Sequence, residues 1–246
     1  MKTKAFQAFE SKLCYFEDDI ELTDVIRSSV ISGDLSELQS DKILKNIDPT
    51  KHSNLTRRQN SDGSRELIVN HLRATIYSAY VKDVYEELTL YLRTVLKQAA
   101  TNGFDAGRII GDHAFKIDAK SVLEQGDWDN VARLISDSVF QALESEKSTL
   151  KLIKKIATKL ALNINEDLIN AALPYLKVRH FLVHSDGILT QEFKTNHPLI
   201  SVSSNGAVIL NYSFITKLRD SVKQLVAAFD AEIISSNLLK PEDLQP

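Results

Sequence analysis

Residues 64–100 read SRELIVNHLRATIYSAYVKDVYEELTLYLRTVLKQAA, and this stretch decides the fold. Apolar side chains recur along it every three or four positions, which is the spacing of one helix face. A helix of this length spans roughly 50 Å at ~1.5 Å per residue, so we expect it to run the length of the domain. Asn102 or Gly103 suits the left-handed position that ends such a helix.

The same spacing continues on both sides of this helix. It predicts further helices at residues 5–31, 129–145, 147–160 and 213–236. Residues 33–63 predict a short helix near 36–47 followed by an exposed loop, and residues 104–130 predict only short pieces. We expect the tail beyond residue 236 to be loose.

Two local signals interrupt the helical pattern. Pro174 lies inside the helix that follows Asn165, and it predicts a kink or a split into two helices. Residues 203–206, Ser-Ser-Asn-Gly, separate two short apolar runs and predict a β-hairpin near the last helix. Together these patterns predict one all-α domain over residues 1–246. It is an up-and-down helical bundle with its core at 64–236 and the N-terminal helix packed on that core.

Composition excludes several classes of protein. Only 8 glycines and 5 prolines occur in 246 residues, which argues against a turn-dense β-sandwich. Cys14 is the single cysteine, so neither an internal disulfide framework nor a cysteine-based zinc module is possible. The net charge of −3 removes the argument for a broadly basic protein that coats duplex DNA. The single cysteine also fits a reducing, cytoplasmic compartment, which we expect for this chain. No stretch approaches ~18 apolar residues without charge, so we expect no membrane span.

One string concentrates residues suited to phosphate chemistry. Residues 178–187 read VRHFLVHSDG and place Arg179, His180 and His184 at the end of a helix. RNA is cleaved when its own 2′-hydroxyl attacks the adjacent phosphate, which requires proton transfers and positive charge. Histidine, with an ordinary pKa near ~6.5, transfers protons at neutral pH, and arginine offers a planar fork to phosphate oxygens. On a regular helix, Arg179 and His184 lie ~140° apart, so spacing alone does not bring them together.

The string RHFLVH resembles the R-x4–6-H motif of the HEPN superfamily of α-helical RNA-cleaving domains. The resemblance implies a metal-independent endoribonuclease, without a cofactor, in which Arg179 contacts the scissile phosphate and His184 is the general acid or base. His180 would have a supporting role. A polar residue of the long early helix would assist, and Lys82, Asp83 and Glu86 are equal candidates. Members typically form homodimers with two motifs in one cleft, and many are toxins, sometimes restrained by an antitoxin, or antiviral defence effectors.

Other interpretations of the same residues stay open. Basic side chains near a helix end also stabilise its carbonyls, which is the commonest reason for finding them there. His180 and His184 are four positions apart, a spacing that suits a metal ion. A catalytically inactive module that binds RNA or another protein could keep the same scaffold. The remaining histidines are expected to be surface or core residues: His52, His71, His113 and His197.

Two further side-chain stripes have ordinary explanations. The tyrosines of the long helix follow its apolar face and predict core or dimer packing: Tyr77, Tyr80 and Tyr91. Four lysines at helical spacing predict a solvated face, with a phosphate-tracking surface as the alternative: Lys151, Lys154, Lys155 and Lys159.

Overall fold

The computed structural model describes residues 1–36, 44–58, 64–111, 117–146 and 148–245. In chain order the described elements are β1 (Lys2–Thr3), α1 (Lys4–Ser32), α2 (Ser53–Arg58), α3 (Ser64–Thr101), α4 (Ala106–Ile110), α5 (Ala119–Leu123), α6 (Trp128–Glu144), α7 (Thr149–Lys159), α8 (Glu166–His184), α9 (Gln191–Asn196), α10 (Tyr212–Ser235), the 3-10 helix η1 (Pro241–Asp243) and β2 (Leu244–Gln245). The predicted all-α class is confirmed.

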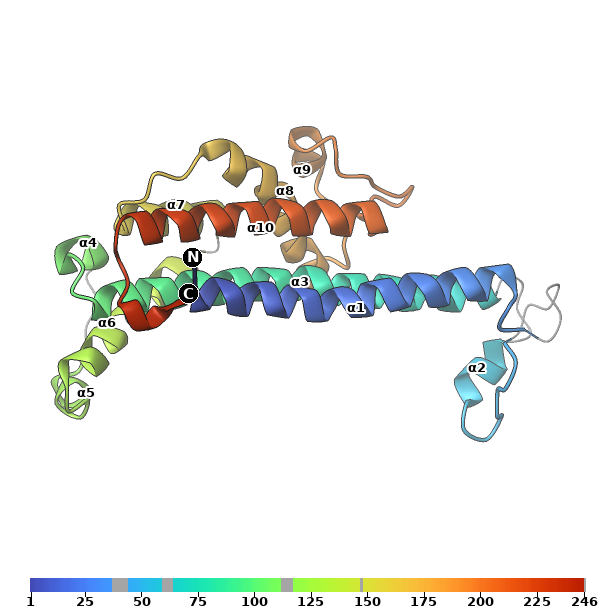
Figure 1. Cartoon of the computed structure of the whole chain (residues 1–246). Helices are drawn as coiled ribbons and strands as arrows, with labels where there is room; N and C mark the ends of the chain where they lie inside the picture. The colour runs from blue at the N-terminus through green and yellow to red at the C-terminus, as the bar shows by residue number, and fades with distance from the viewer. Residues whose placement is uncertain (37–43, 59–63, 112–116, 147, 246) are drawn as a thin grey trace.

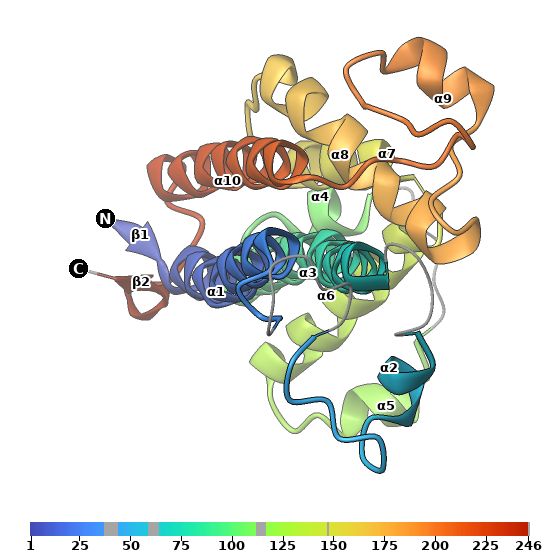
Figure 2. The ribbon, with the colours of Figure 1, turned by 90° about the vertical axis from the view of Figure 1, so that its right-hand side faces the viewer.

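The long helix α3 lies at the centre of the bundle. Helix α1 runs beside it, and α10 lies over this pair in one layer with α7 and α8 (Figure 1). Seen from the end, α5 and α6 occupy the opposite side (Figure 2). Helix α3 therefore contacts α1, α6, α8 and α10, and its apolar face forms the middle of the core. The prediction that Tyr77, Tyr80 and Tyr91 are packing residues is confirmed, since all three are buried.

The two ends of the chain are tied together, so the expectation of a loose tail is wrong. Strand β1 pairs antiparallel with β2, and Leu238 and Leu239 are buried in the core. Beside this pair, the buried carboxylate of Asp230 accepts hydrogen bonds from the Thr3 backbone N–H at 3.1 Å and from Thr3 Oγ1 at 2.5 Å. It also accepts one from the Tyr91 hydroxyl at 3.2 Å. These bonds satisfy a group that is costly to bury alone.

Several local predictions need correction or refinement. Helix α8 continues through Pro174 without dividing, because packing against α3, α7 and α10 holds both halves. Helix α2 lies in the stretch predicted as a loop. The predicted hairpin forms its turn, with a bridge between Val202 and Val208 and a hydrogen bond from Ser203 N to Ala207 O at 2.8 Å. Most of the short helix expected near 36–47 lies outside the described residues.

The four-lysine stripe on α7 is only partly a solvated face. Lys154 forms an ion pair with Glu166 at 2.6 Å, and Lys155 forms one with Glu146. Lys159 is buried and donates to the Ile109 carbonyl at 2.6 Å. Its solvated placement was therefore a wrong prediction: the ammonium instead binds carbonyls at the end of α4, where a helix presents acceptors.

Candidate functional site

Helix α8 carries all three motif residues and is firmly positioned. The Asn165 side chain caps it by accepting from the Asp167 N–H, and Glu166 and Asp167 place negative charge in its first turn. Its buried residues pack against α3, α7 and α10: Ile169, Ala172, Leu173, Leu176 and Val178. This packing fixes the rotation of the helix about its axis, and with it the direction of each motif side chain.

Arg179 is held against the central helix. Its guanidinium Cζ lies 4.8 Å from the centroid of the Tyr85 ring on α3, which is a cation–π contact. Its Nε is buried, and within the described part of the chain Arg179 makes no hydrogen bond or ion pair. A ring face attracts the charge but occupies none of the N–H donors. The half-buried guanidinium therefore keeps its donors for an anion.

His180 and His184 lie next to each other. Their ring centroids are 4.7 Å apart with an angle of 51° between the planes, and both residues are exposed. Four positions along a helix correspond to ~40° of rotation, so the two imidazoles share one face. No described hydrogen bond joins Arg179 to either imidazole. The structure thus brings the two histidines together, while Arg179 contacts Tyr85 on the α3 side of α8.

A pocket of about 310 Å³ lies on the histidine side of α8, between this helix and α9. We call it the α8–α9 pocket. Its walls include the side chains of Lys177, His180, Phe181, Glu192, Asn196 and His197. Ring contacts hold its frame: Phe181 meets Phe193 with centroids 5.0 Å apart, and Phe193 meets His197 at 4.6 Å.

His197 is the member of this pocket with a perturbed pKa. Burial lowers the pKa of His197, and the neighbouring positive charge of Lys177 lowers it further. Both effects favour the neutral imidazole. A neutral ring can stack on a flat partner and can donate one hydrogen bond and accept another.

A second, larger hollow lies on the other side of α8. This groove, of about 770 Å³, is lined by Lys82, Asp83 and Glu86 of α3 together with Asp186 and Gly187. All three early-helix candidates therefore lie along one groove beside the residues that follow His184. Burial raises the pKa of Asp83, and the nearby charge of Glu86 raises it further. These features do not single out one of the three as the assisting residue.

Two residues of this region, Tyr85 and His197, were not predicted as part of the site. Tyr85 was not among the predicted site residues, and His197 was predicted to be a surface or core residue. Both come to the motif through packing between separate helices, so neither gives a local signal. His113 lies outside the described residues. His52 accepts a hydrogen bond from the Asp48 N–H, and His71 is exposed along the α3 groove.

The described residues also bear on metal binding and on membrane insertion. They contain no group of three or more histidine, cysteine, aspartate or glutamate side chains arranged to hold a metal ion. Within the same ranges, no helix combines the length and apolar character needed to cross a membrane. No family model, curated protein or solved structure matches this chain.

Proposed function

We propose that this protein is an endoribonuclease that cleaves RNA without a metal ion, using Arg179, His180 and His184. One observation carries the proposal: Arg179 is half-buried, has no hydrogen-bond or ion-pair partner among the described residues, and directly precedes the first of two exposed, adjacent histidines. Phosphate is the anion that an arginine fork and imidazoles both suit. The resemblance of RHFLVH to the HEPN motif supports the same reading.

The reaction needs two proton transfers, and the histidine pair supplies two suitable groups. A neutral imidazole takes the proton of the 2′-hydroxyl while the 2′-oxygen attacks phosphorus. An imidazolium donates a proton to the 5′-oxygen as the P–O5′ bond breaks. The products are a 2′,3′-cyclic phosphate and a 5′-hydroxyl. Because the rings of His180 and His184 lie 4.7 Å apart, both transfers can come from one protomer.

Arg179 stabilises the charge that develops on the phosphoryl oxygens. Its cation–π contact with Tyr85 holds the guanidinium in position before substrate arrives, which lowers the cost of reorganisation during the reaction. The exposed end of α8 also leaves His184 and Val183 free to face a second copy of the chain. We therefore propose a homodimer in which the two motifs share one cleft, and a role as a toxin or antiviral effector by the same resemblance.

The test compares four variants on a labelled single-stranded RNA in the presence of EDTA. We expect Arg179→Ala and His184→Ala to lose at least ~100-fold in cleavage rate, as expected for a general acid–base or phosphate-binding group. Arg133→Ala and His52→Ala are matched controls on α6 and near α2, and both should cut normally.

The cleavage products and the oligomeric state complete this test. Products of the wild-type protein should end in a 2′,3′-cyclic phosphate, and light scattering should give the mass of a dimer. Equal cleavage by Arg179→Ala and the controls would overturn the assignment. RNA binding by the wild-type protein without any cleavage would instead identify an inactive binding module.

A further inference from the structure

The α8–α9 pocket shares His180 with the proposed catalytic site and extends away from it. Its volume of about 310 Å³ lies at the lower end of the ~300–1,000 Å³ typical of small-molecule sites. A space of this size accepts one nucleotide and excludes a folded helix or strand. The pocket therefore has the dimensions of a subsite for a single residue of a longer substrate.

The lining of the pocket is suited to a flat heteroaromatic ring. His180, Phe181, Phe193 and His197 form a continuous series of ring contacts from α8 to α9. Unstacked RNA bases bind to such rings by stacking, which is a common way for proteins to hold single-stranded RNA. His197, whose pKa is lowered by burial and by Lys177, presents a neutral ring there.

Polar groups at the same pocket suit the rest of a nucleotide. Among the described residues, no carboxylate forms an ion pair with Lys177, so its ammonium is available to a phosphate. Glu192 and Asn196 lie four positions apart on α9 and both line the pocket. A carboxylate accepts hydrogen bonds from the ring N–H and amino groups of a base, and an amide can donate or accept. The phosphate-binding group Lys177 belongs to α8, whereas the base-binding groups Glu192 and Asn196 belong to α9, so they lie on opposite walls of the pocket.

From this arrangement we infer that the α8–α9 pocket binds one unstacked nucleotide of single-stranded RNA adjacent to the linkage that is cut. The base stacks on the imidazole of His197, at the end of the ring series, its edge meets Glu192 and Asn196, and its phosphate meets Lys177. This inference rests on the proposed function for its substrate class. It adds to that function a specificity subsite whose α9 residues lie outside the motif string.

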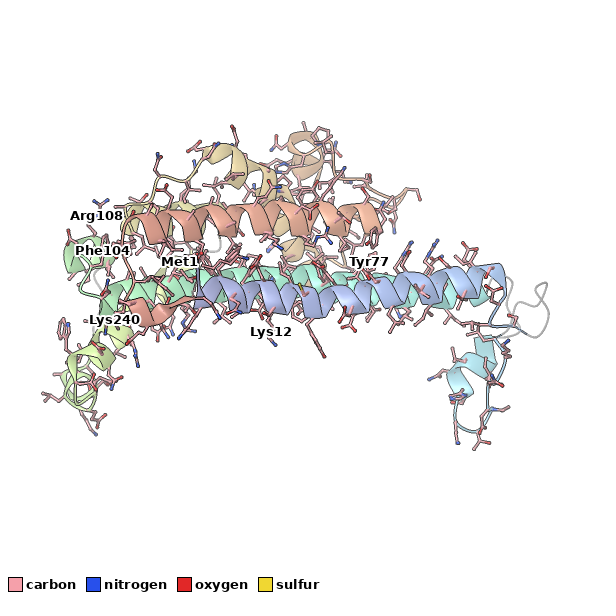
Figure 3. All side chains as sticks on the ribbon, in the orientation of Figure 1. Met1, Lys12, Tyr77, Phe104, Arg108 and Lys240 are labelled. Carbon is pink, nitrogen blue, oxygen red and sulfur yellow. The ribbon has the colours of Figure 1, made fainter. Side chains whose placement is uncertain are left out.

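Binding can be tested without cleavage by using a fluorescein-labelled 2′-O-methyl octaribonucleotide, which lacks the attacking hydroxyl. We expect His197→Ala to weaken binding about tenfold through lost stacking. Lys177→Ala should weaken it about fivefold and reduce the dependence of log affinity on log salt by about one. Lys12→Ala is the matched control, because Lys12 lies on α1 and points away from the α10 layer (Figure 3). Unchanged affinity in both pocket variants would overturn the inference.

A second measurement locates the ligand. The chain has 6 histidines, so their ring-proton NMR signals can be followed individually. Nucleoside 5′-monophosphates should shift the signals of His180 and His197, whereas inorganic phosphate alone should leave the His197 signal nearly unchanged. A His197 signal that none of the four nucleotides moves would contradict the proposed base site, as would equal shifts with inorganic phosphate.

These results separate the pocket from the nuclease assignment. Loss of cleavage in Arg179→Ala with normal binding in His197→Ala and Lys177→Ala would remove the pocket inference alone. Nucleotide binding at His197 in a protein that cuts no RNA would remove the nuclease assignment and leave the binding site.

Discussion

The guanidinium of Arg179 lies over the ring of Tyr85, with Cζ 4.8 Å from the ring centroid. This contact joins the end of the motif helix α8 to the middle of the central helix α3. It places the arginine's position under the control of the bundle rather than of the exposed turn that follows His184. The catalytic proposal therefore predicts an effect on cleavage from a residue that touches no substrate.

Replacing Tyr85 tests that effect. Tyr85→Leu removes the π face, and we expect RNA cleavage to fall about fivefold, in line with a cation–π contact of ~1 kcal/mol. Tyr85→Phe keeps the face and should retain most of the activity. Urea unfolding of both variants checks that the fold is unchanged. Equal loss of activity in the two variants would mean that the hydroxyl matters, contrary to this account.

The histidine pair makes a prediction about its two members. If each imidazole carries one proton transfer, then His180→Gln should reduce the cleavage rate by ~100-fold or more, close to the effect of His184→Gln. The double variant should be little worse than either single variant, because the groups act as a unit. Rates of the three variants on one labelled RNA measure this. A His180→Gln protein with near-normal cleavage would restrict the chemistry to His184 and its mate across a dimer.

Gly187 closes the motif turn with φ +79°, a conformation that an L side chain adopts only with strain. Gly103 has the same φ at the end of α3 and has nothing within 4 Å of an added Cβ. We expect Gly187→Ala and Gly103→Ala each to lower the free energy of unfolding by ~1–2 kcal/mol. Only Gly187→Ala should also lower RNA cleavage, because it alters the turn after His184. Parallel urea titrations and cleavage assays compare the two variants.

The buried Asp230 carboxylate predicts a stability effect far from the site. Asp230→Ala removes the acceptor for the Thr3 N–H, the Thr3 hydroxyl and the Tyr91 hydroxyl. We expect the free energy of unfolding to fall by ~2–3 kcal/mol, since donors to a charged group lose their partner. Tyr91→Phe deletes a single bond and should cost about 1 kcal/mol. If Tyr91→Phe proved the more damaging change, Asp230 would not be the centre of this network.

Asp137 predicts a dependence of stability on pH. Burial acts to raise the pKa of Asp137, but hydrogen bonds from Arg93 at 2.7 Å and Lys97 at 2.8 Å outweigh it and hold the pKa below its usual 3.8. A lowered pKa in the folded state stabilises the protein above the unfolded pKa, and this stabilisation is lost as pH falls through the folded pKa. Asp137→Asn should therefore be ~1 kcal/mol less stable at pH 7, and the difference should shrink as pH falls below the usual pKa of 3.8 and through the lowered pKa of the folded state. A difference that grows on acidification would contradict this sign.

The main helices were predictable because their signals are local. The three- and four-residue spacing of apolar side chains located α1, α3 and α10 to within two residues, and Asn102 or Gly103 was predicted to end α3. Pro174 does not divide α8 into two helices, because a proline disfavours a helix interior only by its own local cost, which packing against α3, α7 and α10 outweighs. The tail was wrongly predicted to be loose. Leu238 and Leu239 are not part of a repeating apolar pattern that would indicate burial, yet both pack into the core.

In the candidate site, too, the contacts within one helix could be predicted from the sequence, whereas the contacts between helices could not. The adjacency of His180 and His184 follows from their separation of four positions on one helix. The contact of Arg179 with Tyr85 joins residues 94 positions apart, and His197 reaches the pocket only because α9 folds back beside α8. Such contacts depend on how helices pack, which one sequence does not reveal.

The bond between Thr3 and Asp230 spans 227 positions, so it forms only when almost the whole bundle is in place. Contacts between residues so far apart in the sequence have the largest entropic cost of loop closure, so they form late in folding. A ribosome-bound chain that has not yet released α10 lacks the acceptor for its own first turn. For a protein with the proposed ability to cut RNA, this arrangement delays the finished shape until translation of that helix is over.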